Sequence, residues 1–283
     1  WDGTVDGNWD TTTANWQGSA TYANGDDVTF DDSASGTTDI TVVAGGVTPG
    51  SVMINNSTLD YSFGGGPIGG TTGLTKDGSG TLVLGAANSY SGATQIDGGV
   101  VQLGAASALG NTSGVTVAPG GTLDVNGINA NTVATIAGNG ATGQGALVNT
   151  GGSIIGNLGL VLADDATIGI YGGRMDIGIG KPLQGNGHTL TKLGGGRLPV
   201  RTSAGSFGAM IVEEGTLYFE TNQSAMSGTP ITVKGGATVG MYYSKLISAP
   251  ITLEHEAKLA QLGGGSGTTS EWSGAMTVEG DAH

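Results

Sequence analysis

Short segments in which apolar and polar residues alternate recur along most of this chain. Each segment follows a turn residue, and the second and fourth positions after it are apolar in nearly every copy. The turn residues lie 19 to 23 residues apart, except for one interval of 31 residues between Gly121 and Gly152. The second positions hold Leu59, Leu82, Val101, Leu123, Ile154, Met175, Leu198, Leu217, Val239 and Leu259. The fourth positions hold Tyr61, Leu84, Leu103, Val125, Ile177, Val200, Phe219 and Met241, with Gly156 and Gln261 as exceptions.

Alternation of this kind predicts strands with one buried and one wet face, because successive side chains of a strand point to opposite sides. A strand that returns every ~20 residues after a turn is typical of one coil of a solenoid. We therefore predict an all-β fold, a right-handed parallel β-helix of about a dozen coils. The 31-residue interval predicts a loop insertion or an irregular coil. Pro199 predicts a second irregularity, because proline cannot donate to a strand ladder.

Part of the chain is duplicated. The stretch that begins Leu74-Thr75-Lys76 matches the stretch that begins Leu190-Thr191-Lys192, at a separation of 116 residues. The copies span residues 74–125 and 190–241. We expect an N-terminal cap with the first coils in residues 1–56. Residues 57–283 are expected to form the β-helix proper, which would continue past the last residue of this sequence.

Composition narrows the classes of partner. Glycine accounts for 57 of 283 residues, a share that suits tight corners with positive φ. The net charge is −14 and there are only nine lysines and arginines, which argues against binding to nucleic acid or to an anionic membrane surface. No apolar run is long enough to cross a bilayer. The absence of cysteine agrees with a secreted bacterial protein.

The first copy of the module resembles a known family of secreted proteins. Residues 73–104 contain Leu-x-Lys-x-Gly-x-Gly-x-Leu-x-Leu, then Asn-x-Tyr-x-Gly-x-Thr, and a closing Gly-x-Val-x-Leu-Gly. This order is similar to that of the passenger-associated transport repeat, also called the autotransporter-associated β-strand repeat. The second copy keeps the Leu-Thr-Lys and glycine elements but has residues 204–207 in place of the Asn-x-Tyr element. The resemblance implies an extracellular β-helical passenger at the bacterial cell surface.

Two functions are compatible with a parallel β-helix. The first, which we prefer, is a non-enzymatic structural or adhesive stalk. Its partners would be copies of itself, other surface proteins or glycans, and it would need no cofactor. The second is a carbohydrate-active enzyme, either a polysaccharide lyase or a glycoside hydrolase.

The enzyme alternative needs paired carboxylates, or a basic residue beside acidic calcium ligands. Its candidate residues are Asp124, Asp164, Asp165, Asp176 and Glu220, together with Arg174, Arg197 and Arg201. We expect these scattered charges to keep a rod soluble. Convergence of Asp124, Asp176 and Arg174 in a groove would favour the enzyme.

Two further clusters stand near the N-terminus. Four aspartates, Asp26, Asp27, Asp31 and Asp32, could contribute to a calcium site or could solvate strand ends. Trp1, Trp9 and Trp16 could form a glycan platform, but a cap over the open core is the better interpretation, since tryptophan is mostly buried. The histidines, His188, His255 and His283, show no metal-ligand spacing. We therefore predict no metal site and no catalytic residue.

Overall fold

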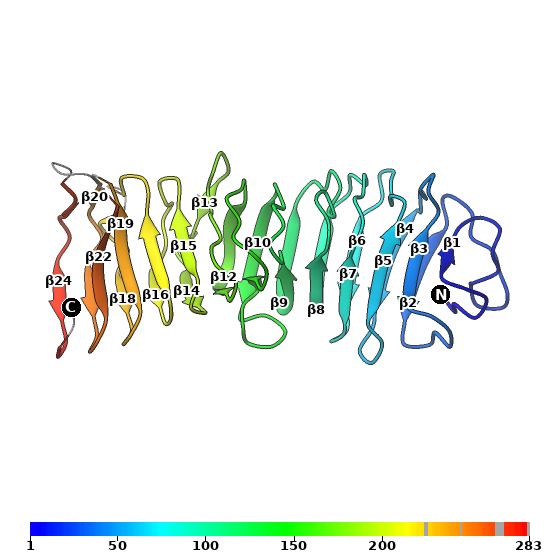
Figure 1. Cartoon of the computed structure of the whole chain (residues 1–283), viewed down its shortest axis with the longest axis horizontal. Coiled ribbons are helices and arrows are strands. Elements are labelled where there is room, and N and C mark those ends of the chain that lie inside the picture. Colours follow the sequence, from blue (N-terminus) through cyan, green and yellow to red (C-terminus); the bar gives the residue numbers. More distant parts are fainter. Residues whose placement is uncertain (224–225, 244, 264–268, 282–283) are drawn as a thin grey trace.

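The chain forms a rod of stacked parallel strands. A computed structural model describes residues 1–223, 226–243, 245–263 and 269–281. Within these ranges the secondary structure is β throughout, with no α-helix, and the coils form a β-solenoid of about 11 turns, as the sequence predicts. Figure 1 shows the coils following one another from the N-terminal to the C-terminal end of the rod. No helix of the described residues is long and apolar enough to cross a membrane.

The strands stack in three columns along the rod. Column A contains β2 (Asp27–Asp31), β4 (Ser51–Asn55), β6 (Leu74–Asp77), the first parts of β8 (Thr94–Leu103) and β9 (Val115–Asp124), β10 (Val133–Gly138), the first part of β12 (Gly159–Ile170) and β13 (Leu183–Gln184). Column B contains β1 (Asn8–Trp9), β3 (Asp39–Val42), β5 (Tyr61–Gly65), β7 (Thr81–Leu84), the second parts of β8 and β9, β11 (Leu147–Asn149), the second part of β12, β14 (Thr189–Leu193), β16 (Ala209–Val212), β18 (Ile231–Val233), β21 (Ile251–Leu253) and β24 (Met276–Val278).

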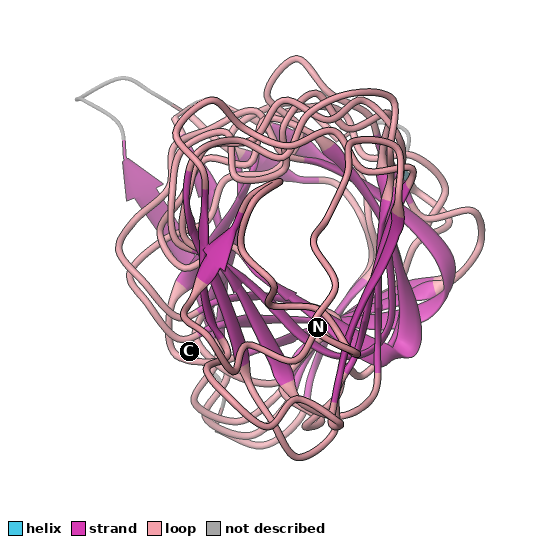
Figure 2. Cartoon of the chain, turned by 90° about the vertical axis from the view of Figure 1, so that its right-hand side faces the viewer, coloured by secondary structure: helices cyan, strands magenta, loops and turns pink. Residues whose placement is uncertain are grey.

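Column C is regular only in the C-terminal half of the rod. It contains β15 (Arg197–Val200), β17 (Thr216–Phe219), β19 (Thr238–Tyr242) and β22 (Lys258–Gly263), preceded by isolated bridges such as Ile154 with Met175. A short pair, β20 (Leu246–Ile247) and β23 (Glu271–Trp272), forms a separate two-stranded sheet near the C-terminal end. Figure 2 shows the tube end on from the N-terminal side, with strands forming its walls and loops at its corners.

Because of the alternating pattern, every second side chain of a strand points into the interior of the tube. In β4 the exposure alternates strictly, with Val52 and Ile54 buried between exposed neighbours. Leu82, Val101 and Leu123 follow one another up column B and are fully buried. Each coil therefore buries its apolar side chains against the coils before and after it, which is how a solenoid acquires a continuous core.

Glycine is required at the corner between columns A and B. Gly99, inside β8, has φ +64°, a conformation that side chains other than glycine rarely adopt. A Cβ atom at this position would lie 2.2 Å from the carbonyl oxygen of Gly80 and 2.5 Å from that of Gly78. The glycines of the repeat motif thus allow consecutive coils to pass closely at their corners.

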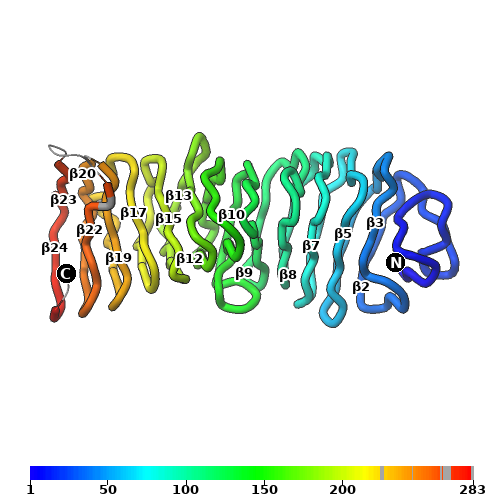
Figure 3. Tube along the Cα trace, in the orientation of Figure 1, coloured from blue at the N-terminus to red at the C-terminus, as the bar shows by residue number. Residues whose placement is uncertain are grey.

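The second copy of the module is rotated about the rod axis by one column. Leu74 of the first copy lies in column A, whereas its counterpart Leu190 pairs with Ala166 in column B. The 31-residue interval explains the rotation. Leu123 does not stack on Ile154, as the sequence period suggests, but on Leu147 of the additional strand β11. The interval therefore contains one extra wall of a coil, and Figure 3 traces the chain through this region.

A buried lysine closes a corner in each copy of the module. The Lys76 ammonium donates to the carbonyl oxygens of Asp77 at 2.7 Å and Gly78 at 2.9 Å. Its counterpart Lys192 donates to the carbonyl oxygens of Gly194 at 2.6 Å and Glu214 at 2.9 Å. Both side chains are fully buried. Burial lowers the pKa of each lysine from 10.5 to about 8.

Aromatic rings fill the N-terminal end of the tube. The side chains of Trp1 and Trp9 are buried, and Trp16 is half-buried against the same core. Trp1 lies edge-on to Trp16 at 5.2 Å between ring centroids, and Trp9 packs on Phe30 at 5.2 Å. Rings buried against one another leave little surface for a sugar, so the geometry favours the cap over a glycan platform.

The rotation of the second module can be tested with cysteine pairs, because the natural chain contains no cysteine. Thr167 and Thr191 are direct partners in column B, and neighbouring parallel strands lie ~4.8 Å apart, within the range that a disulfide spans. We expect the double variant Thr167→Cys/Thr191→Cys to form an intramolecular disulfide under mild oxidation, measured by mass spectrometry. The control Val161→Cys/Thr191→Cys tests the unrotated stacking on column A. A disulfide in the control alone would contradict the rotation.

The two buried lysines should give the fold a characteristic pH dependence. Between pH 8 and pH 10.5 they are protonated in the unfolded chain but largely neutral in the native one. The unfolded state then binds more protons, so the free energy of unfolding should rise with pH across this window. We expect this rise in the free energy of unfolding, measured by denaturant unfolding, to be smaller in Lys76→Met/Lys192→Met. The contribution that tyrosine ionisation makes above pH 10 is the same in both proteins and is subtracted. An identical slope in both proteins would contradict the assignment.

Candidate functional site

Column C carries an outward-facing set of charged and aromatic side chains, which we name the Arg/Tyr face. Its inward residues, including Met175, Leu198 and Leu217, are buried in the core, so the alternating residues of the same strands point outward. All three arginines of the chain belong to this face. It consists of Arg174, Asp176, Arg197, Arg201, Tyr218, Glu220, Tyr242 and Tyr243.

Four of these side chains form an ion-pair network across three coils. Arg174 donates through Nε and Nη2 to both carboxylate oxygens of Asp176, and its Nη2 also lies 3.1 Å from Oε1 of Glu220. Arg201 pairs with Oε2 of Glu220 and lies 3.6 Å from Oδ2 of Asp176. Asp176 has no exposed surface. Its hydrogen bond raises the pKa of Arg174 above the ordinary value, so the guanidinium stays charged at every accessible pH.

The tyrosines extend this network toward the C-terminal coils. The guanidinium carbon of Arg174 lies 5.8 Å from the ring centroid of Tyr218, a cation–π distance. Tyr218 in turn lies 6.1 Å from Tyr242, which meets Tyr243 edge-on at 4.4 Å. Tyr218 is buried, whereas Tyr243 is 50% exposed and has φ +62°. A non-glycine residue held in this strained conformation with its ring in solvent is a feature that often marks a contact site.

Arg197 is the free cation of this face. Its backbone forms a bridge with that of Arg174 on the preceding coil. In the described part of the chain it has no ion pair, and its side chain is exposed. The face therefore presents three guanidinium groups against two carboxylates, inside a chain of net charge −14.

Of the predicted carboxylates, Asp124, Asp176 and Glu220 do not assemble into a hydrolytic pair. The structure brings Asp176 and Glu220 together, but two guanidinium groups bind their oxygens and Asp176 cannot be reached from solvent. Asp124 lies apart at the end of β9 in column B. Its carboxylate accepts hydrogen bonds from Gln102 at 2.9 Å and from the Thr150 hydroxyl at 2.6 Å. A glycosidase acid must reach the glycosidic oxygen, which this arrangement does not allow.

A shallow groove of about 630 Å³ lies elsewhere on the rod. Its lining comprises Thr41, Val42, Ala44, Gly65, Gly66, Pro67, Ala87 and Asn88. None of these residues has a titratable side chain, so the groove offers contact surface but no group for acid–base catalysis. It also contains none of the charged residues singled out in the sequence.

The four N-terminal aspartates accept hydrogen bonds at turns and between neighbouring coils. Asp26 accepts from the backbone NH of Ala23 at 2.8 Å, and Asp27 accepts from the Ser51 hydroxyl at 2.6 Å. Asp31 binds Ser33, and Asp32 accepts from the backbone NH groups of residues 57–59. These hydrogen bonds lower the pKa of Asp32 to about 2. The geometry thus favours turn and strand-end solvation over a shared calcium ion.

The histidines have different surroundings. His255 lies 3.8 Å from Glu256, and His283 falls outside the described residues. His188 lies beside Asp164 and Asp165, a grouping that the sequence analysis missed. The available signal was the separation of His188 from Asp165, which is 23 residues and so about one coil.

Removing Arg174 should destabilise the fold, because Asp176 would remain buried with only the more distant Arg201 as counter-ion. We expect Arg174→Gln to lower the free energy of unfolding by roughly 2–4 kcal/mol, measured by chemical denaturation. Arg197→Gln is the matched control, from the same column and the next coil, and should change stability by less than about 0.5 kcal/mol. Equal effects of both variants would show that the network does not hold this part of the rod.

Comparison with known proteins agrees with this architecture. Residues 74–103 match the passenger-associated transport repeat. A segment of 95 residues, 33% of this chain, is 36% identical to the adhesin BmaC autotransporter of Brucella suis biovar 1 (strain 1330). The matched segment spans 3% of that protein's length. No solved structure matches the chain. The chain thus contains a passenger-associated transport repeat and is similar over a third of its length to an autotransporter adhesin, and with the parallel β-solenoid these features fit an autotransporter passenger.

Proposed function

We propose that this chain is a non-enzymatic, adhesive β-helical stalk at the bacterial cell surface, and that its Arg/Tyr face binds anionic glycans. The concentration of every arginine of an acidic chain on one outward face carries the proposal. Similarity to an autotransporter adhesin supports an adhesive role and an extracellular location.

The chemistry of the face suits a carboxylated or sulfated sugar. Arg197 offers a guanidinium free of ion pairs, and guanidinium groups bind carboxylate and sulfate oxygens in a bidentate manner. Tyr243 offers an exposed ring against which a sugar can pack. The ion-pair network links the neighbouring coils that carry this face, so little conformational freedom of these coils is lost on binding.

The same network argues against the enzyme alternative. General acid catalysis requires a carboxyl group that can hold and deliver a proton at the scissile bond. Asp176 is fully buried and bound by Arg174 through both oxygens, and Glu220 is bound by two arginines. Charges paired in this way stabilise the contact between neighbouring coils and are not free to transfer a proton.

Glycan and host-matrix arrays probed with the purified chain test the proposal directly. We expect saturable binding to acidic glycans that weakens as salt rises, because exposed ion pairs are screened. Arg197→Gln and Tyr243→Ala should each weaken binding about ten-fold, a loss of ~1.4 kcal/mol. Lys234→Gln is the control, since Lys234 pairs with Glu254 beyond β18 in column B.

A parallel assay of reducing-sugar release separates adhesion from catalysis. Binding without release is the expected result. Release of sugar would overturn the non-enzymatic assignment. Glycan binding that is unchanged in Arg197→Gln and Tyr243→Ala would show that the chain binds glycans through a surface other than the Arg/Tyr face.

A further inference from the structure

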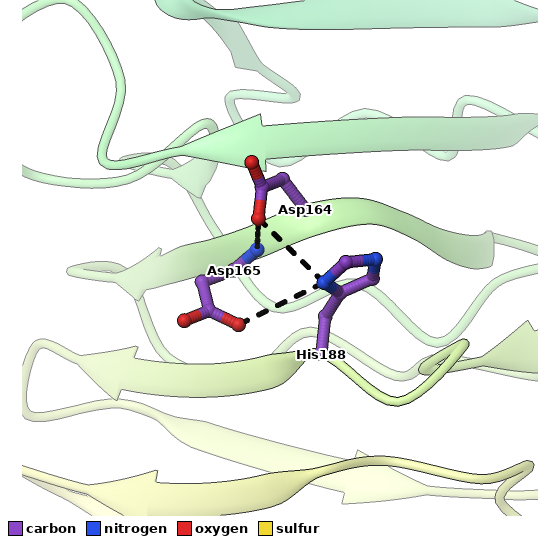
Figure 4. Close-up of side chains that lie close together, drawn as sticks. All are labelled: Asp164, Asp165 and His188. Carbon is purple, nitrogen blue, oxygen red and sulfur yellow. Dashed lines mark hydrogen bonds and ion pairs between the residues drawn. The ribbon is translucent and has the colours of Figure 1, made fainter.

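Two aspartates and one histidine converge at the corner between columns A and B, whereas the ion-pair network lies on column C. Asp164 and Asp165 lie in β12, between its column A part and its column B part, and His188 directly precedes β14 on the next coil. Figure 4 shows both carboxylates facing one ring nitrogen. His188 Nδ1 lies 3.6 Å from Asp164 Oδ1 and 3.9 Å from Asp165 Oδ1.

These separations are too long for hydrogen bonds and suit three ligands around one cation. The three ligand atoms all lie within 4.8 Å of one another. Two ligand atoms ~2.1 Å from a zinc ion at a tetrahedral angle lie about 3.4 Å apart. The two distances to His188 exceed this value by only a few tenths of an ångström, so small side-chain rotations of the exposed aspartates would bring the three atoms around one ion.

The backbone fixes the positions of these ligands. Asp164 Oδ1 accepts from the backbone NH of Asp165 at 2.8 Å, and Asp165 Oδ1 accepts from that of Thr189 at 2.7 Å. Asn186 donates from its side chain to the Leu162 carbonyl at 2.8 Å, which ties the His188 turn to the preceding coil. Both carboxylates are more than two-thirds exposed, so an ion and its remaining water ligands can reach them.

We propose that Asp164, Asp165 and His188 form a divalent transition-metal site, with zinc as its simplest occupant. One imidazole nitrogen with two carboxylate oxygens is a donor set for zinc, copper or nickel rather than for calcium, which takes oxygen ligands. Three protein ligands leave coordination positions open to water. The ion would join β12 to β14, the contact at which the rotated second module begins.

The test uses the whole chain with zinc chloride as the probe. We expect saturable binding of one zinc ion by calorimetry, weakened at least about ten-fold in His188→Gln and in Asp165→Asn. The asparagine keeps an oxygen to cap Thr189 while it removes the charge. His255→Gln is the control, because His255 faces a single carboxylate. Zinc should also raise the melting temperature of the natural chain and of the control variant, and not that of His188→Gln.

Nitrogen NMR of the imidazole rings separates a metal site from a simple ion pair. Zinc should shift the Nδ1 resonance of His188 selectively, since Nδ1 is the nitrogen that faces both aspartates. Equal zinc affinity in His188→Gln, a shift confined to Nε2, or no saturable uptake would each overturn the proposal. In the last case the three side chains would form a polar contact between coils and no metal site.

Discussion

The hydrogen-bonded ladder between successive coils is the constraint on which the rest of this molecule depends. It places residues about one coil apart in sequence at ~4.8 Å in space, and it does so along the whole rod. Arg174 meets Arg197 through this ladder, and Lys192 reaches the Glu214 carbonyl through it. Asp165 meets His188 for the same reason.

The ladder also explains why the candidate site is a face and not a cleft. Outward side chains on stacked strands form rows, and opposite charges on neighbouring coils stabilise such a row. Asp176 and Glu220 therefore lie among arginines, and their burial follows from the long guanidinium side chains that cover them. Such a surface suits recognition, because the paired charges are held in place before any ligand arrives, while Arg197 has no ion pair among the described residues.

The sequence predicted the parts of the fold that follow from local alternation. Strands, buried positions and coil length could be read directly, because an inward residue such as Leu82 must be apolar whatever surrounds it. The column in which each strand lies could not be predicted, because β11 within the 31-residue interval does not carry the repeat pattern. Lys76 and Lys192 were missed because lysine is normally exposed, and only a corner rich in carbonyl oxygens makes their burial tolerable.

Contacts of the candidate site that arise between equivalent positions of adjacent coils could be predicted from the sequence, and the other contacts could not. The stacking of Arg174 on Arg197 followed from equivalent positions in adjacent repeats. The contact of Arg174 with Glu220 did not, because it crosses two coils and depends on side-chain length as well as on register. The pairing of His188 with the aspartates was accessible from coil length alone, once the corner was recognised as a place where side chains of adjacent coils meet.

Comparison of the two module copies shows where the Arg/Tyr face came from. Inward positions stayed apolar, with Leu82 matched by Leu198 and Leu103 by Phe219. Outward positions changed character: the counterparts of Arg197, Arg201, Tyr218 and Glu220 in the first copy are Thr81, Gly85, Gln102 and Gly104. The core fixes the inward residues and leaves the outer wall free to vary. Since the second copy is also rotated by one column, its charged face points away from the neutral face of the first, and the rod presents different chemistry on different sides.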